Sequence, residues 1–248
     1  MSGLTPEEEQ ILQTLQAKKA AATGDKIVHV IQVLDKSSSM GTGQDITISA
    51  FNENLGIMAE NQNVAKTTAT LITFSDPDKV KVEFREASPD RAVRLSRSNY
   101  TPSGMTALYD AIGKALEIAR EFEGSNSNAQ FLLQIFTDGD ENRSIRYSAG
   151  TLKSLISELN STGRWTVTVM GPRGSLDLFT KNLGVHSGNT VQFDASSVKS
   201  RGFAKSALNA STANYFTATA AGATSMSDAY ASVVQGGNVE NLVDQPKP

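Results

Sequence analysis

The sequence lacks cysteine altogether and has only two histidines, His29 and His186, among its 248 residues. Without cysteine, disulfides, thiolate metal sites and thiol nucleophiles are all excluded. Two histidines are too few for a His-rich zinc cluster within one chain. The formal net charge of −3 provides no overall basic field, and we therefore expect no nucleic-acid partner.

Long apolar runs are also missing from the chain. No stretch reaches the roughly 18 apolar residues that a bilayer-spanning helix needs. The N-terminal residues MSGLTPEEEQ are acidic and do not contain the apolar core of a signal peptide. We therefore expect a cytoplasmic protein without a membrane partner.

The length suits one domain of about 200 residues with short extensions. Residues 1–25 are expected to form an N-terminal helical extension, because Thr5 and Pro6 suit a helix start and Gly24 suits its end. After Phe216 the chain becomes rich in Ala, Ser, Thr and Gly. This composition predicts a main domain over residues 26–217 and a flexible C-terminal tail over residues 218–248.

Apolar strands alternate with amphipathic helices along the main domain. Strands are expected at 26–35, 68–74, 79–84, 129–138, Trp165–Met170 and Thr190–Phe193. Helices are expected at Asp45–Glu60, 105–124, Tyr147–Leu159, Ser175–Leu183 and Gly202–Tyr215. The SDPD turn makes the second and third strands an antiparallel pair. The pattern predicts an α/β fold, a three-layer, doubly wound, mainly parallel six-stranded sheet with one antiparallel edge strand and helices on both faces.

Oxygen-bearing side chains follow three of these strands. The first strand ends in LDKSSSM, which contains Asp35, Ser37 and Ser39. Thr106 precedes the third helix in SNYTPSGMTALYD, and the strand AQFLLQIF runs into Asp138. Open parallel sheets bind ligands outside the carboxyl ends of their strands, and we expect the five side chains to meet there.

This set of ligands suits a hard divalent cation. Mg²⁺ is usually held by one or two carboxylates with other oxygens around it, and Mn²⁺ or Ca²⁺ also accepts oxygen ligands. Serine and threonine hydroxyls coordinate without cancelling the charge of the ion. Such a site stays electrophilic and attracts a carboxylate from another molecule. Each residue alone also suits an ordinary helix cap or turn, so the prediction depends on all five together.

The three segments together resemble von Willebrand factor A domains, which also occur as the inserted domains of integrins. LDKSSSM matches the D-x-S-x-S signature, and GMTALYDAIGKAL and FTDGDEN match the other two ligand segments in the expected order. The resemblance covers about residues 26–217 and is closest to intracellular bacterial or phage members. Ser38 stands where the family often has glycine, which puts the loop geometry in question.

The resemblance implies a metal-ion-dependent adhesion site and a Rossmann-like fold without enzymatic activity. By this likeness Ser37 and Ser39 bind the ion directly, Thr106 is a switchable ligand, and Asp35 and Asp138 bind directly or through water. The ion is Mg²⁺, or alternatively Mn²⁺ or Ca²⁺, and a Glu or Asp of a partner protein completes its coordination. The family also relates the ligand state to movement of its last helix, here Gly202–Tyr215.

Two other functions stay open at this point. A Mg²⁺-dependent phosphohydrolase of the haloacid dehalogenase type also has an aspartate after its first strand, but it needs an acid where Ser37 stands. Alternatively, the tail carboxylates Asp228, Glu240 and Asp244 reach the metal of a neighbouring copy and give a self-assembling structural protein.

Overall fold

The computed structural model describes residues 26–175 and 177–230 as a sheet covered by helices on both faces. The expected N-terminal helix lies outside the described residues. The strands are β1 (Ile27–Asp35), β2 (Lys66–Phe74), β3 (Lys81–Ala87), β4 (Gln130–Phe136), β5 (Trp165–Pro172) and β6 (Thr190–Phe193). The α-helices are α2 (Gln44–Glu60), α3 (Leu108–Ser125), α4 (Ala149–Ser161) and α5 (Val198–Ala220).

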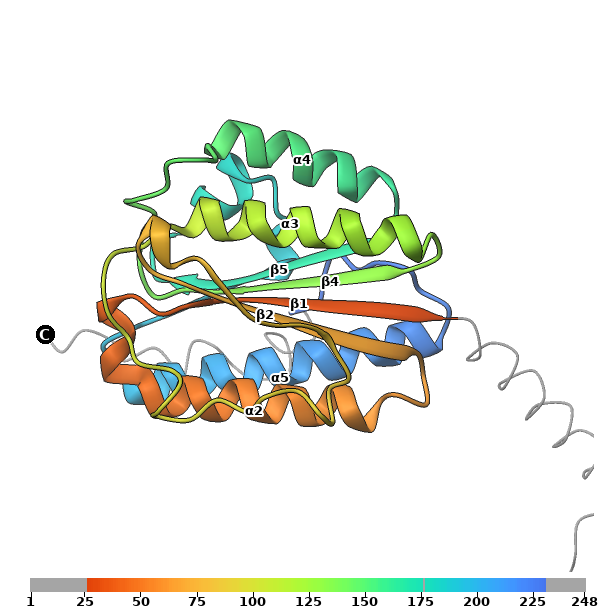
Figure 1. Ribbon diagram of the computed structural model, residues 1–248, viewed down its shortest axis with the longest axis horizontal. Coiled ribbons are helices and arrows are strands. Elements are labelled where there is room, and N and C mark those ends of the chain that lie inside the picture. The colour runs from red at the N-terminus through yellow and green to blue at the C-terminus, as the bar shows by residue number, and fades with distance from the viewer. Residues whose placement is uncertain (1–25, 176, 231–248) are drawn as a thin grey trace, which may run out of the picture.

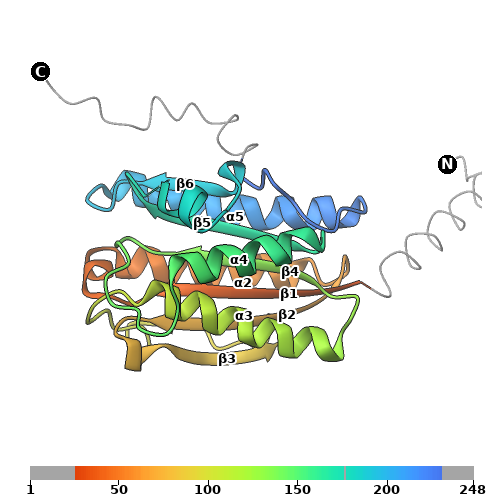
Figure 2. The same ribbon diagram turned by 90° about the horizontal axis from the view of Figure 1, so that it is seen from above.

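The six strands lie in the order β3-β2-β1-β4-β5-β6, and the edge strand β3 alone pairs antiparallel. Helices α3 and α4 cover one face of the sheet, and α2 and α5 cover the other (Figure 1). Seen from above, the strands follow one another across the molecule from β3 to β6 (Figure 2). The predicted fold class is therefore confirmed, including the single antiparallel edge.

The continuous apolar run of β1 fills two cores because alternate residues of a strand point to opposite faces. Ile31 and Val33 join the cluster that contains Leu116 of α3. Val30 joins the other cluster, together with Leu55 of α2. This two-sided burial agrees with the position of β1 inside the sheet, between β2 and β4.

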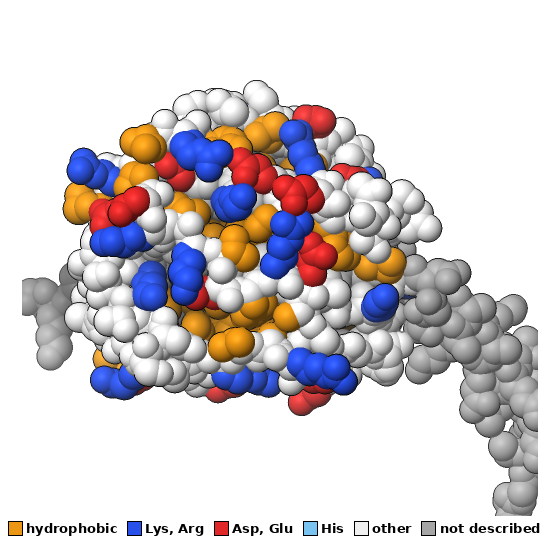
Figure 3. All heavy atoms as spheres, viewed as in Figure 1, with side chains coloured by type: hydrophobic (Ala, Val, Ile, Leu, Met, Phe, Trp, Pro, Cys, Tyr) orange, Lys and Arg blue, Asp and Glu red, His pale blue; other side chains and the backbone are white. Residues whose placement is uncertain are grey.

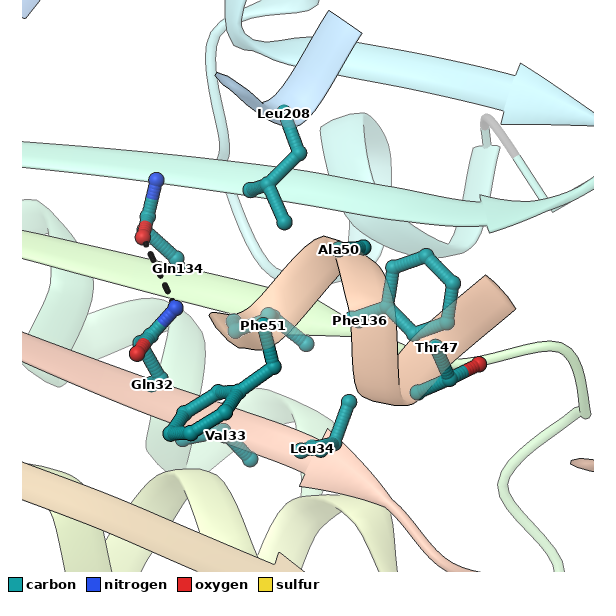
Figure 4. Close-up of a pocket in the computed structure, with 10 residues that line it drawn as sticks. Gln32, Val33, Leu34, Thr47, Ala50, Phe51, Gln134, Phe136 and Leu208 are labelled. Carbon is teal, nitrogen blue, oxygen red and sulfur yellow. Dashed lines mark hydrogen bonds between the residues drawn. The ribbon is translucent and has the colours of Figure 1, made fainter. Parts of the chain in front are cut away.

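A small polar network interrupts the core between the sheet and helices α2 and α5. The Gln32 amide nitrogen donates to Asn54 Oδ1 at 3.2 Å and to Gln134 Oε1 at 3.3 Å. Thr212 Oγ1 accepts from Asn54 at 2.7 Å and from Gln134 at 2.9 Å. A cavity of about 20 Å³ lies beside the two glutamines, against Leu208 (Figure 4). The network thus ties α2 and α5 to β1 and β4.

One expected helix differs from the structure. Ser175–Leu183 was expected to be a helix, but its regular part is a five-residue π-helical turn at Leu178–Asn182. Buried Phe179 anchors this turn, and Gly184, with φ of 73°, follows it.

The last helix extends beyond residue 217, the expected end of the main domain. Helix α5 continues to Ala220, and Tyr230 is buried with its N–H donating to Gly188 O at 3.0 Å. Small polar residues such as Thr212 and Thr219 form part of the buried face of α5, so hydropathy does not reveal it. Of residues 218–230, which belong to the segment expected to be a flexible tail, Thr219, Ala229 and Tyr230 are buried, and the others are half-buried or exposed. The remainder of that segment, 231–248, lies outside the described residues.

Charges of both signs alternate with apolar and neutral side chains on the face seen in Figure 3. Within residues 26–175 and 177–230, no helix is long and apolar enough to cross a bilayer.

Candidate metal centre

The predicted ligand residues come from neighbouring strand ends at the carboxyl edge of the sheet. Asp35 is the last residue of β1, and Asp138 follows β4 by two residues. The parallel register pairs Leu34 with Phe136, so both carboxylates leave the sheet at the same level. The chain proceeds from β1 to β2 on one side and places β4 on the other, so the order of strands reverses here. Ligands bind at such switch points in doubly wound sheets.

Asp35 is fully buried and fixed through both of its carboxylate oxygens. Oδ1 accepts from the Ser37 N–H at 2.7 Å, and Oδ2 accepts from the Thr137 hydroxyl at 2.6 Å. Burial raises the pKa of Asp35 to about 6, and the nearby charge of Asp138 adds to the rise, while the two hydrogen bonds oppose it. The Asp35 carboxylate is thus held in one orientation, while its negative charge is only partly stabilised.

A chain of hydroxyls connects the first loop to Asp138. Ser37 Oγ and Ser39 Oγ lie 3.0 Å apart, and Ser39 donates to Asp138 Oδ1 at 2.6 Å. Both serines lie at the start of the short 3-10 helix η1 (Ser38–Gly43), whose tight turn keeps their side chains together.

Asp138 has one carboxylate oxygen without a hydrogen bond. Among the described residues, none donates to the buried Oδ2 atom, and the nearest cationic nitrogen, Arg201 Nη2, is 3.9 Å away. Burial raises the pKa of Asp138, whereas the hydrogen bond from Ser39 and the positive charge of Arg201 oppose the rise. A buried carboxylate oxygen without a partner is unusual in proteins and points to a missing cation or water.

Thr106 reaches the same place from the loop before α3. Its backbone is fixed to the loop after β4, because Asn142 donates to Thr106 O at 3.1 Å and Asn142 Oδ1 accepts from Thr106 N at 3.1 Å. A Cβ built on Gly139 would lie 3.2 Å from Thr106 Oγ1 and 3.7 Å from Ser39 Oγ. The side chain missing from Gly139 therefore leaves room for both hydroxyls.

Backbone hydrogen bonds also join the loop after β1 to the loop before α3. Ser38 N donates to Gly104 O at 3.1 Å, and Ser103 N donates to Lys36 O at 2.8 Å. Gly104 has a φ of 85°, a left-handed conformation that glycine adopts without strain. The loop carrying Thr106 is thereby fixed beside the loop carrying the two serines.

Two acids fix the loop that follows Asp138. Glu141 accepts from the backbone N–H groups of three residues and from one hydroxyl. Asp110 on α3 accepts from three consecutive backbone N–H groups of the loop, those of residues 145–147. Both carboxylates therefore serve the loop backbone and hold it against α3.

The assembled donors fit a hard divalent cation. We call Asp35, Ser37, Ser39, Thr106 and Asp138 the oxygen cluster. Each of its side chains offers oxygen, and Asp138 has one oxygen bonded to a serine hydroxyl and a second, buried oxygen without a hydrogen bond among the described residues. Within the described parts of the chain, no three Asp, Glu, His or Cys side chains converge to hold a metal. A cation in the oxygen cluster would therefore need the neutral hydroxyls among its ligands.

Three residues around the oxygen cluster were not among the predicted ligands. Thr137 holds Asp35, the buried Tyr100 donates its hydroxyl to Asp35 O, and Arg201 approaches Asp138. Thr137 was visible in the sequence as the residue before Asp138. Tyr100 and Arg201 carry no local signal, because only the tertiary fold brings them to the site.

The structure also bears on the two alternative functions. The phosphohydrolase needs a proton donor at position 37, and Ser37 instead contacts Ser39. Of the tail carboxylates, Asp228 lies against Gly188, just before β6, and so at the opposite edge of the sheet from the oxygen cluster. Glu240 and Asp244 lie outside the described residues.

Comparison with known proteins agrees with this architecture. The family described as von Willebrand factor type A domain matches residues 29–182. A search of curated proteins finds no match. Among solved structures, the pilus adhesin SpaC from Lactobacillus rhamnosus GG aligns with a TM-score of 0.57 and 12% identity over 79% of this chain and 31% of its own. Proximal thread matrix protein 1 from the mussel byssus aligns with a TM-score of 0.50 and 16% identity over 80% of this chain and 47% of its own. Identities this low show a shared fold, and the chain spans less than half of either protein.

Proposed function

Because the chain belongs to the von Willebrand factor type A domain family, we propose that it is a non-enzymatic binding module that captures an acidic residue of a partner protein through a divalent cation held by the oxygen cluster. The proposal extends the family assignment to these particular side chains and to a partner.

One observation carries the proposal, namely the buried Asp138 Oδ2 atom without a hydrogen-bond partner among the described residues. Ser39 already occupies the other oxygen of Asp138, and Ser37 lies beside Ser39. The Asp138 carboxylate thus lies beside the two serine hydroxyls that the proposal assigns to the cation. The cation would also compensate the charges of two carboxylates that burial otherwise disfavours.

Each residue of the cluster has a distinct task in this proposal. Ser37 and Ser39 bind the ion directly, as neutral ligands. Asp35 and Asp138 supply the negative charge, directly or through water, and Thr106 supplies a switchable ligand from a separate loop. When bound, the ion offers an open coordination position to an oxygen anion.

The expected ion is Mg²⁺, with Mn²⁺ and Ca²⁺ as alternatives. Two carboxylates and several neutral oxygens form the kind of donor set that Mg²⁺ accepts while keeping part of its water shell. The cytoplasmic location inferred from the sequence stays a prediction.

Titration with Mn²⁺, monitored by water-proton relaxation, tests whether the oxygen cluster binds a cation. We expect one site in the wild-type protein, competition by Mg²⁺, and loss of the site in Asp138→Ala. Asp177→Ala is the matched control, because Asp177 is an exposed aspartate paired with Lys181. Equal Mn²⁺ binding by the two variants would refute the assignment of the site.

Acetate, used as a carboxylate probe, tests whether the bound cation captures an anion. Acetate added to the Mn²⁺-loaded protein should displace metal-bound water and lower the relaxation enhancement, whereas acetamide, its neutral analogue, should not. A lower relaxation enhancement with both probes, or with neither, would contradict the capture of an anion by the bound ion.

A further inference from the structure

A buried arginine lies beside the oxygen cluster without being a ligand in it. Arg201 is only 7% exposed, and its Nη2 atom is 3.9 Å from Asp138 Oδ2. This distance is too long for a hydrogen bond but short for two opposite charges in a buried setting. The guanidinium thus acts on Asp138 as a charge while leaving Oδ2 without a donor.

Contacts with other groups hold the guanidinium at this distance. Arg201 Nε donates to Ala195 O at 2.6 Å, and Nη2 donates to the Thr42 hydroxyl at 2.6 Å. On its other side the guanidinium packs against Gly43, where any Cβ would overlap with Nη1. Arg201 belongs to the first turn of α5, and Thr42 and Gly43 belong to η1, which also carries Ser39. The positive charge is therefore fixed from two sides.

The charges around the site give this arginine a consequence for binding. Asp35 and Asp138 together carry two negative charges, which a divalent ion would neutralise. A neutral centre attracts a carboxylate only weakly at long range. With Arg201 included, the loaded site has a net charge of +1, because arginine stays protonated in proteins.

Resting on the function proposed above, we infer that Arg201 weakens binding of the cation to the oxygen cluster and strengthens capture of the partner's carboxylate. Its charge repels the incoming ion and attracts the incoming anion. The two effects have opposite signs at one site. A purely structural arginine would give a different signature, because loosening the loops would weaken both binding steps.

Arg201→Gln separates these two explanations, since glutamine removes the charge and can still donate to Ala195 O. We expect Mn²⁺ to bind about tenfold more tightly and acetate to bind the Mn²⁺-loaded protein about tenfold more weakly, the order of effect for a unit charge near a dication. Arg201→Lys, which keeps the charge, should shift both affinities much less. Lys199→Gln is the matched control, because Lys199 lies in the same helical turn and is exposed.

Unfolding by urea in EDTA gives a readout that does not depend on bound metal. The variants Arg201→Gln and Asp138→Asn and their double variant form a double-mutant cycle. We expect the double variant to be more stable than the sum of the single changes implies, because each single change leaves one buried charge without its counterpart. If Arg201→Gln does not fold, Arg201→Met provides the same test with an apolar side chain.

The outcomes are distinguishable. Parallel weakening of Mn²⁺ and acetate binding in Arg201→Gln, or no change in either, would overturn the inference about Arg201. Failure of the wild-type protein to bind Mn²⁺ would instead overturn the proposed function, and additivity in the metal-free cycle would then also exclude the pairing of Arg201 with Asp138.

Discussion

Ser39 donates its hydroxyl hydrogen to Asp138 across 99 positions of sequence, at 2.6 Å. The contact joins the loop after β1 to the loop after β4 and leaves the second oxygen of Asp138 free for another partner. The same hydroxyl is a predicted ligand of the cation. The contact therefore supports both the metal-free loop arrangement and the proposed metal site.

Replacing Ser39 by alanine should have two separable effects. Without metal, loss of a hydrogen bond to a charged group should lower the free energy of unfolding by about 1.5–3 kcal/mol. With Mg²⁺ at a hundred times its Kd, the wild-type protein should gain about 2.7 kcal/mol, and Ser39→Ala should gain much less. Urea unfolding in EDTA and in Mg²⁺ measures both effects.

Ser154→Ala provides the control for this experiment, because Ser154 is exposed on α4 and its hydroxyl bonds only to Gly150 O at 3.2 Å among the contacts described. This variant should gain as much from Mg²⁺ as the wild-type protein. An equal Mg²⁺ effect in Ser39→Ala would place the ion elsewhere.

Replacing Gly139 by alanine tests how closely the Thr106 hydroxyl must approach the cation. A Cβ there would lie 3.2 Å from Thr106 Oγ1, so Gly139→Ala should push Thr106 outward and weaken Mn²⁺ binding at least about tenfold. Gly41→Ala is the matched control in η1, because no atom lies within 4 Å of its added Cβ. Calorimetric titration with Mn²⁺ compares the two, and equal affinities would show that Thr106 does not approach the ion.

The sequence was sufficient to predict the sheet and the convergence of the oxygen cluster, for one physical reason. Residues that directly follow neighbouring parallel strands must meet at one edge, so Asp35 and Asp138 could be placed together without knowing any packing. Their role as ligands remains a prediction. Arg201 could not be placed in this way, since its position depends on how the first turn of α5 packs against η1.

The same limit applies to the segment after α5. Tyr230 is buried by contacts with a turn before β6, and the Ala- and Thr-rich sequence that leads to it has no periodic apolar pattern. Within α5 itself, small polar residues can be buried because their hydroxyls bond to the helix backbone, as Ser211 does to Leu208 O at 2.8 Å. Hydropathy alone therefore does not reveal the buried face of α5 or the burial of Tyr230.

Thr212 should be important for stability because its hydroxyl accepts hydrogen bonds from two buried amides, those of Asn54 and Gln134. Thr212→Val keeps the shape but leaves both amide donors unpaired, and should lower the free energy of unfolding by about 2–4 kcal/mol. Thr217→Val makes the same change at an exposed position of α5 and should cost about 0.5 kcal/mol or less. Urea unfolding in EDTA measures both, and equal losses would show that the hydrogen bonds from Asn54 and Gln134 to Thr212 do not stabilise the fold.

Acid should destabilise the protein through His29. This residue is fully buried on β1, its ring stacks on Phe122 at 4.3 Å, and its Nδ1 atom lies 2.7 Å from Thr68 Oγ1. Burial, assisted by the positive charge of Arg85, lowers the pKa of His29 from 6.5 to about 3. The folded protein therefore keeps the ring neutral at pH values where the unfolded chain protonates it.

The sign of the effect follows from this difference. The contribution of His29 to the free energy of unfolding is complete above pH 6.5 and falls as the pH drops toward 3, by up to about 1.4 kcal/mol per pH unit. Asp35 acts in the opposite direction below pH 6, because burial raises the pKa of its carboxyl to about 6. Comparison of the wild-type protein with His29→Gln cancels the Asp35 contribution.

Urea unfolding in EDTA at pH 7, 6, 5 and 4 measures the comparison. The wild-type protein should lose stability relative to His29→Gln with each step below pH 6.5. A constant difference between the wild-type protein and His29→Gln over this range would mean that His29 is protonated equally in the folded and unfolded states. The buried, neutral imidazole described for β1 would then be wrong.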